Sequence, residues 1–193
     1  MDKTILYLFI LTVGLELIYL LLFILTIRLP GFRFWPPSGP RSWQFLTAWF
    51  MALLVTANFL ILGLLNFDRF ILPGFWVRLP FALTFFIFGG LIGSWSFWKF
   101  GIKTTIGLGD QLITGGPYRF SRNPQYIGDI SNILGFMILT NSWMVGIIGV
   151  FGIILNLLAP FTEEPWLEDK FGEAYQAYKQ KVPRFIAWRQ FPG

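Results

Sequence analysis

The chain has 193 residues, of which 55% are hydrophobic and 13% are charged, whereas roughly 25% of the residues in an ordinary soluble domain carry a charge. Histidine and cysteine are both absent, which excludes disulfides, thiolate chemistry, His-Cys zinc sites and an imidazole base. The formal charge of +5 does not indicate nucleic-acid binding, because the basic residues are spread between apolar runs. We therefore predict an all-α polytopic membrane protein whose partners are membrane lipids, with neither nucleic acid nor metal, and leave its oligomeric state open.

Five apolar stretches follow one another along the chain. They cover residues 4–27, 43–65, 79–98, about 126–139, and 143–160. About 20 apolar residues make one helical crossing of the hydrocarbon layer, so the first three stretches are long enough to cross. The first is too long for a signal-peptide core and is expected to stay as an anchor. The fourth is short and only three residues separate it from the fifth, which predicts a tight helical hairpin and leaves open whether the fourth stretch crosses fully.

The positions of lysine and arginine predict how the chain is oriented. With five spans, one side of the membrane receives twelve basic residues and the other side receives three. The larger group is Arg28, Arg33, Arg41, Lys99, Lys103, Arg119, Arg122, Lys170, Lys179, Lys181, Arg184 and Arg189, and the smaller is Lys3, Arg69 and Arg78. Cytoplasmic loops accumulate basic residues, so the N-terminus is expected outside and the C-terminus in the cytoplasm. Tryptophans near the span ends, Trp35 among them, fit the aromatic belts of a membrane interface.

The segment after the third stretch has the composition of a loop that lies against a ligand. Five glycines occur between residues 101 and 117, and glycine lets the backbone turn and approach a ligand closely. Pro124 is placed to begin the fourth helix, with Asn123 as its N-cap. Arg119 and Arg122 then join the free amides of a helix N-terminus, a combination suited to a carboxylate or a phosphate.

Two adjacent carboxylates, Glu163 and Glu164, follow the last apolar stretch. Neighbouring residues of a helix point about 100° apart, so at most one of the two is expected to face a given pocket. Downstream, Phe171, Tyr175 and Tyr178 recur at helical spacing. This pattern predicts one or two short amphipathic helices on the cytoplasmic side, with the aromatic side chains packed against the core.

Glu16 lies in the middle of the first stretch, where a carboxyl group is costly and usually faces a partner or a cavity. Two interpretations stay open at this point. The side chain contacts substrate, or it has a structural role in which it is protonated or bonded to Asn58 or to another helix. Asn58, Asn132 and Asn156 are expected to form hydrogen bonds between helices.

The order and spacing of these polar residues resemble the integral-membrane methyltransferases typified by isoprenylcysteine carboxyl methyltransferase and phosphatidylethanolamine N-methyltransferase. The resemblance covers roughly residues 107–185, the C-terminal part of the chain. It consists of Gly107 and Gly109, the run Gly-Pro-Tyr-Arg to Tyr-Ile-Gly from Gly116 to Gly128, the pair Glu163 and Glu164, and the run from Phe171 to Tyr178. The chain departs from the pattern at Asn123, where many relatives have a histidine, and asparagine can form hydrogen bonds but cannot titrate.

The resemblance implies S-adenosylmethionine as the cofactor, bound at the cytoplasmic end of the hairpin, and a lipophilic substrate that arrives from the bilayer. It places the following residues at the cofactor: Gly107, Gly109, Gly116, Tyr118, Arg122, Asn123, Tyr126, Glu163 and Glu164. Arg122 and Glu164 are the candidate catalytic residues. Residues 1–98 are expected to form a three-helix scaffold on the substrate side, and residues 99–193 the cofactor loop, the hairpin and a cap, within one membrane domain.

The chemistry of methyl transfer favours one class of acceptor. Holding two reactants in line contributes about 7–11 kcal/mol, and a carboxylate is already an anion near neutral pH, so it needs no base. An amine or a thiol must lose a proton, here to Glu163, Glu164, Asp129 or a tyrosine. A carboxylate such as that of isoprenylcysteine is therefore preferred to a phospholipid amine. The Gly128-Asp129 pair also resembles membrane sterol reductases that use NADPH, and a transporter or an inert scaffold is the third alternative.

Overall fold

The structure is a computed structural model that describes residues 2–68, 70, 72–109 and 111–186. Every regular element in these ranges is helical. The elements are α1 (Lys3–Arg28), α2 (Trp43–Leu65), α3 (Phe75–Thr105), the short 3-10 helix η1 (Gly116–Arg119), α4 (Pro124–Thr140), α5 (Trp143–Phe171) and α6 (Glu173–Lys181). Four of them, α1, α2, α3 and α5, are long and apolar enough to cross a membrane. The predicted all-α polytopic membrane fold is confirmed.

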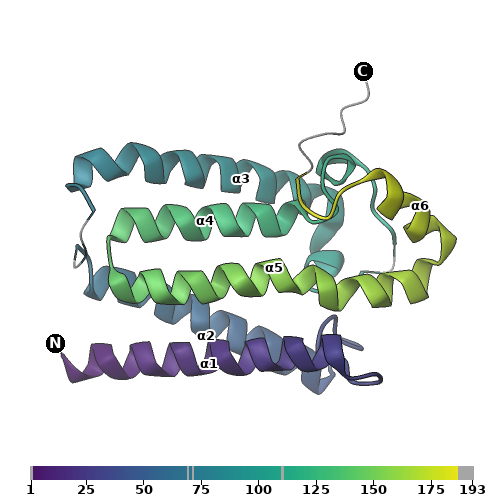
Figure 1. The fold of residues 1–193 in the computed structure, drawn as a ribbon, viewed down its shortest axis with the longest axis horizontal. Helices are drawn as coiled ribbons and strands as arrows, with labels where there is room; N and C mark the ends of the chain where they lie inside the picture. The colour runs from purple at the N-terminus through teal and green to yellow at the C-terminus, as the bar shows by residue number, and fades with distance from the viewer. Residues whose placement is uncertain (1, 69, 71, 110, 187–193) are drawn as a thin grey trace.

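The five long helices lie side by side, with α2 behind α1 and α5 (Figure 1). Helix α3 packs on α4, α4 packs on α5, and α1 packs on both α5 and α2. One end of the bundle, called the α6 end below, carries α6, the α1–α2 connection and the loop after α3 (Figure 1). The opposite end, called the turn end, carries the α2–α3 connection and the turn between α4 and α5.

The predicted helical hairpin is formed by α4 and α5. Its turn contains Asn141, whose backbone is left-handed (φ 46°), and Ser142, whose hydroxyl accepts a hydrogen bond from the Val145 N–H at 3.3 Å and so caps α5. With 17 residues, α4 is shorter than the other four long helices and extends about 25 Å along its axis. It lies beside α3 and α5 within the bundle (Figure 1).

Two helices extend further than their apolar stretches. Helix α3 reaches Thr105 across a backbone break at Gly101 (φ 67°, ψ 167°), so it passes the expected division after residue 98. Helix α5 continues past Pro160 and Pro165 to Phe171. The length of an apolar stretch reflects the thickness of the hydrocarbon layer, whereas a helix can continue beyond that layer. The polar part of α5 does so, and it places both glutamates at the α6 end.

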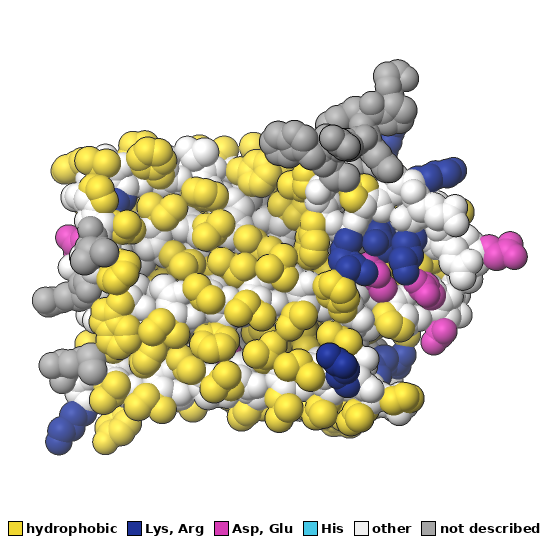
Figure 2. All heavy atoms as spheres, viewed as in Figure 1, with side chains coloured by type: hydrophobic (Ala, Val, Ile, Leu, Met, Phe, Trp, Pro, Cys, Tyr) yellow, Lys and Arg dark blue, Asp and Glu magenta, His cyan; other side chains and the backbone are white. Residues whose placement is uncertain are grey.

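Charged side chains gather at the α6 end, where they form a patch beside the apolar body of the molecule (Figure 2). The two predicted groups of basic residues lie at opposite ends: Arg28 closes α1 at the α6 end, whereas Lys3 and Arg78 belong to the first turns of α1 and α3 at the turn end. Arg69 and Arg189 lie outside the described residues. The apolar band between two polar ends is that of an integral membrane protein.

Candidate functional site

A cavity of about 620 Å³ extends from the α6 end into the interior of the bundle. This volume lies within the usual range for a site that binds a small molecule, roughly 300–1,000 Å³. Its polar part is lined by Gly107, Gly109, Tyr118, Arg122, Asn123, Tyr126, Glu163 and Glu164. Its deep part is lined mostly by apolar side chains, among them Val55, Phe59, Phe136, Ile148 and Leu155, and its wall also includes Glu16 and Asn132. One space therefore joins a polar chamber to a largely apolar one at membrane depth.

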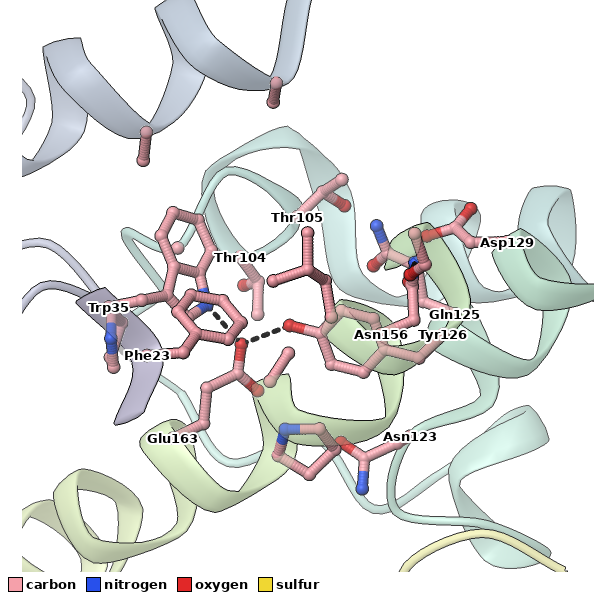
Figure 3. A pocket seen from close by; sticks show the side chains of 18 of the residues that line it. Phe23, Trp35, Thr104, Thr105, Asn123, Gln125, Tyr126, Asp129, Asn156 and Glu163 are labelled. Carbon is pink, nitrogen blue, oxygen red and sulfur yellow. Dashed lines mark hydrogen bonds between the residues drawn. The ribbon is translucent and has the colours of Figure 1, made fainter. Parts of the chain in front are cut away.

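Glu163 lies in the polar part of the cavity, between Trp35 and Tyr126 (Figure 3). The indole Nε1 of Trp35 donates a hydrogen bond to Oε1 of Glu163 at 2.6 Å, and the Tyr126 hydroxyl donates to the same oxygen. Trp35 comes from the α1–α2 connection, 128 residues away in sequence. The sequence interpretation placed Trp35 in an interfacial belt, and no local pattern indicates its contact with Glu163.

Glu164 forms ion pairs with two arginines. Nη1 of Arg122 lies 2.9 Å from Oε1 of Glu164, and the Nε and Nη2 atoms of Arg184 each donate to the carboxylate at 2.7 Å. The side chains of Arg122 and Glu164 are only 7% and 8% exposed. Both glutamates line the cavity. The expectation that at most one would face it was wrong, because the cavity extends across both of these faces of α5.

Arg122 is held in place by the C-terminal part of the chain. Its backbone N–H donates to the Pro183 carbonyl at 2.9 Å, and its Nη1 donates to the Tyr175 hydroxyl at 3.0 Å. Burial raises the pKa of Tyr175 to about 12, so the phenol is neutral at physiological pH. Tyr178 donates to the Tyr118 carbonyl at 2.7 Å. The predicted aromatic packing of the amphipathic helix is confirmed, and the hydroxyl groups also position the loop that carries Arg122.

Asn123 occupies the N-cap position of α4, as predicted, but its side chain forms no capping hydrogen bond. Its Nδ2 atom instead donates to the Arg184 carbonyl at 2.9 Å, because the segment after α6 passes next to this turn. Ser121 donates to the same carbonyl at 3.2 Å. Arg184, which the sequence interpretation counted only as a basic tail residue, therefore joins the turn before α4 to Glu164.

The glycine loop approaches the site closely. Gly107 has a positive φ of 81°, and a Cβ at this position would lie 2.7 Å from Cη2 of Trp35, so a side chain would displace the indole that holds Glu163. The Lys170 amine donates to the Gly109 carbonyl at 2.8 Å, which ties the loop to α5. Gly116 lies outside the cavity lining, in a left-handed turn (φ 62°) packed against Lys99.

The predicted pair of arginines is not formed as expected. Arg122 is buried in the site, whereas Arg119 is exposed and is not part of the cavity lining. The short helix η1 turns the Arg119 side chain toward solvent, so this residue fits the alternative role of a basic residue at a membrane surface.

A family model described as phospholipid methyltransferase matches residues 77–174, just over half of the chain. Steroid 5-alpha-reductase DET2 of Solanum lycopersicum is 31% identical over 114 residues, which is 58% of this chain and 44% of the relative. Phosphatidylethanolamine N-methyltransferase B of Dictyostelium discoideum is 33% identical over 95 residues, which is 45% of this chain and 47% of the relative.

A third relative is aligned over most of its length. Protein-S-isoprenylcysteine O-methyltransferase of Schizosaccharomyces pombe is 26% identical over 192 residues, 89% of this chain and 80% of the relative. The chain spans about half the length of the first two relatives. No solved structure matches it.

Proposed function

The chain belongs to the phospholipid methyltransferase family, and from this premise we propose that it transfers a methyl group from S-adenosylmethionine to the carboxylate of a lipophilic acceptor such as isoprenylcysteine. One observation carries the proposal. The glycine loop, Arg122 and the two glutamates meet at a single cavity, although more than 50 residues of sequence separate the first from the last. That cavity continues into an apolar chamber, as a lipophilic acceptor requires.

The residues of the polar part fit the cofactor. The Nε atom of Arg122 is buried and has no hydrogen-bond partner among the described residues, so it is available to a carboxylate. Glu163 and the aromatic rings of Trp35, Tyr118 and Tyr126 suit a positively charged sulfonium. Gly107 and Gly109 bring the backbone close without a side chain. When bound, the cofactor supplies the methyl group, already activated on its sulfonium.

The chain's own contribution is to orient the reactants and to exclude water, because a carboxylate acceptor needs no base. Glu164 is paired with two arginines, so we assign it a positioning role: it holds Arg122 against the cofactor. For the alternative acceptor, a phospholipid amine, Glu163 or Asp129 would have to take the proton, since both line the cavity.

We assign the α6 end to the cytoplasmic side and the N-terminus to the outside. Basic residues are concentrated at the α6 end, as in the cytoplasmic loops of membrane proteins (Figure 2). The cofactor would then enter from the cytoplasm, while the acceptor would come from the bilayer.

The test is transfer of label from methyl-labelled S-adenosylmethionine into a lipid extract by the purified chain. Base-labile label would identify an ester, and base-stable label a methylated amine. In parallel, S-adenosylhomocysteine and NADPH are compared for thermal stabilisation of the protein in detergent. Stabilisation by NADPH alone would instead support the reductase alternative, to which the tomato relative belongs by name.

A further inference from the structure

We propose that Glu16 binds a hydrogen-bond donor on the tail of the lipophilic substrate, so that this substrate is recognised at both of its ends. Glu16 is 1% exposed, lies in the middle of α1 and lines the same cavity as Glu163. Its Oε2 atom is buried and has no hydrogen-bond partner among the described residues. The identity of the occupant as a methyl acceptor rests on the proposed function.

A structural role for Glu16 in which it is bonded to Asn58 is not supported. Asn58 is buried on the neighbouring helix α2, but its Nδ2 atom has no hydrogen-bond partner in the part of the chain that the structure describes, so it does not donate to Glu16. A buried carboxyl oxygen without a hydrogen bond is costly, and an ionisable group at membrane depth usually faces a ligand or a cavity. A donor supplied by a ligand would remove this cost.

The packing of α1 on α5 gives the depth of Glu16. The two helices run in the same direction from the turn end to the α6 end (Figure 1). A Cβ placed on Gly152 of α5 would lie 3.8 Å from Oε1 of Glu16, so these two residues lie at the same depth. Glu163 follows Gly152 by eleven residues of the same helix, which corresponds to about 16 Å.

The wall between these two carboxylates combines apolar and polar side chains. Tyr19 and Phe23 of α1 and Leu155 and Ala159 of α5 line this part of the cavity, and so do the polar residues Asp129, Asn132 and Asn156. Glu163 at one of these depths and the unpartnered Glu16 at the other match a ligand that carries a polar group at each end. We therefore infer an acceptor that has its reacting group at one end and, about 16 Å away, a hydroxyl or an amine. A plain hydrocarbon tail would leave Glu16 without a partner.

The inference is tested by lipid binding to the full chain in detergent. The probes are three series of fatty acids of increasing length: unsubstituted, with a terminal hydroxyl, and with a terminal amine. We expect the substituted acids to bind roughly three- to tenfold more tightly than the unsubstituted acid, the range for one buried hydrogen bond, and only at lengths that reach Glu16. Dissociation constants from tryptophan fluorescence would show this preference as a maximum along the series.

Three variants identify the donor and its partner. Glu16→Leu should abolish the preference. Glu16→Gln should keep the preference for the hydroxyl and lose that for the amine, because an amide accepts a hydrogen bond but carries no charge. Thr56→Val, which changes another polar residue of the cavity wall, is the matched control and should leave the preference unchanged.

Two results would overturn the inference: an equal affinity for all three series at every length, or a preference that persists in Glu16→Leu. The length dependence of the unmodified chain is decisive even if Glu16→Leu does not fold, and thermal unfolding in detergent shows whether this variant folds. Probe binding does not require methyl transfer. A Glu16-dependent preference without any transfer would refute the proposed function alone, and transfer without such a preference would refute this inference alone.

Discussion

The two ends of the bundle each contain an arginine paired with a carboxylate, yet the pairs differ in their surroundings. At the α6 end, Arg122 lies 2.9 Å from Glu164, and both side chains are less than one-tenth exposed. At the turn end, Arg78 lies 2.6 Å from Asp68, and the aspartate side chain is 54% exposed. The α6-end pair lines the cavity, whereas the turn-end pair lies at the far end of the helices.

The turn-end pair joins two connections of the chain. Asn141 donates to Asp68 at 2.6 Å and accepts from the Leu72 N–H at 3.1 Å, so the α2–α3 connection is held against the α4–α5 turn. The same chemistry thus has two roles. An ion pair between connections stabilises the fold, and one that borders a cavity is suited to hold a ligand. Substitutions at the two ends separate these roles.

Replacing the α6-end arginine should give the largest effect. In Arg122→Ala we expect the dissociation constant for S-adenosylhomocysteine to rise roughly 10- to 100-fold, because a hydrogen bond to a charged group contributes about 1.5–3 kcal/mol. Calorimetric titration in detergent measures this. The matched control is Arg119→Ala, three residues earlier and exposed, which should change the constant less than threefold. Equal weakening in both variants would contradict the assigned site.

A smaller effect is expected in the glycine loop. Gly107→Ala should lower the free energy of unfolding by about 1–3 kcal/mol, because its φ is positive and its new Cβ would collide with Trp35. Binding of S-adenosylhomocysteine should weaken as well, since Trp35 holds Glu163. Gly115→Ala is the control, with φ −95° and nothing within 4 Å of the added atom. Thermal unfolding in detergent compares the two variants, and a similar loss of stability in both would argue against a collision between the new Cβ and Trp35.

At the turn end, a substitution should change the stability of the fold but not the affinity for the ligand. The Ser142 hydroxyl caps α5 and donates to Asn66 at 2.7 Å. Ser142→Ala should therefore lower the free energy of unfolding by about 1 kcal/mol and leave the affinity for S-adenosylhomocysteine unaltered. Both quantities can be measured on one preparation. A weakened affinity would show that the two ends of the bundle are coupled.

The smallest effect concerns pH. The hydrogen bond from Asn141, assisted by Arg78, lowers the pKa of Asp68 below its ordinary value. The pKa of an aspartate in the unfolded chain is about 4. A carboxylate whose pKa is lower in the folded state stabilises the fold at any pH above that unfolded pKa, and this contribution is lost as the pH falls through the folded-state pKa. Asp68→Asn should thus melt slightly below the unmodified chain at neutral pH. The two melting temperatures should converge under acidic conditions, and a gap that widens on acidification would exclude this interpretation.

Much of the fold was predictable from local sequence. Apolar stretches located the five long helices, and the three residues before Trp143 indicated the hairpin turn. The helix ends were less predictable. Helix α5 continues 11 residues past Pro160, because loss of one backbone donor does not end a helix whose neighbours keep their hydrogen bonds.

Local sequence indicated the main residues of the candidate site but not their partners. Gly107, Gly109, Arg122 and the two glutamates belong to short runs of unusual composition in an apolar chain, and all five line one cavity. Trp35 and Arg184 were missed as site residues because nothing near them in sequence distinguishes a side chain that contacts a glutamate from one at a membrane surface. Arg119 is the opposite case: its neighbours in sequence suggested that it belongs to the site, but the backbone turns its side chain toward solvent.

The sequence by itself determined that this chain is a helical membrane protein with a polar segment at one end, because the transfer of each stretch into the bilayer depends on its own composition. Only the tertiary structure decided which carboxylate meets which donor. Glu163 meets Trp35, Glu164 meets Arg184, and Glu16 reaches the cavity wall through the packing of α1 on α5. Contacts between residues far apart in the chain depend on how the helices pack together, and no local pattern contains that information.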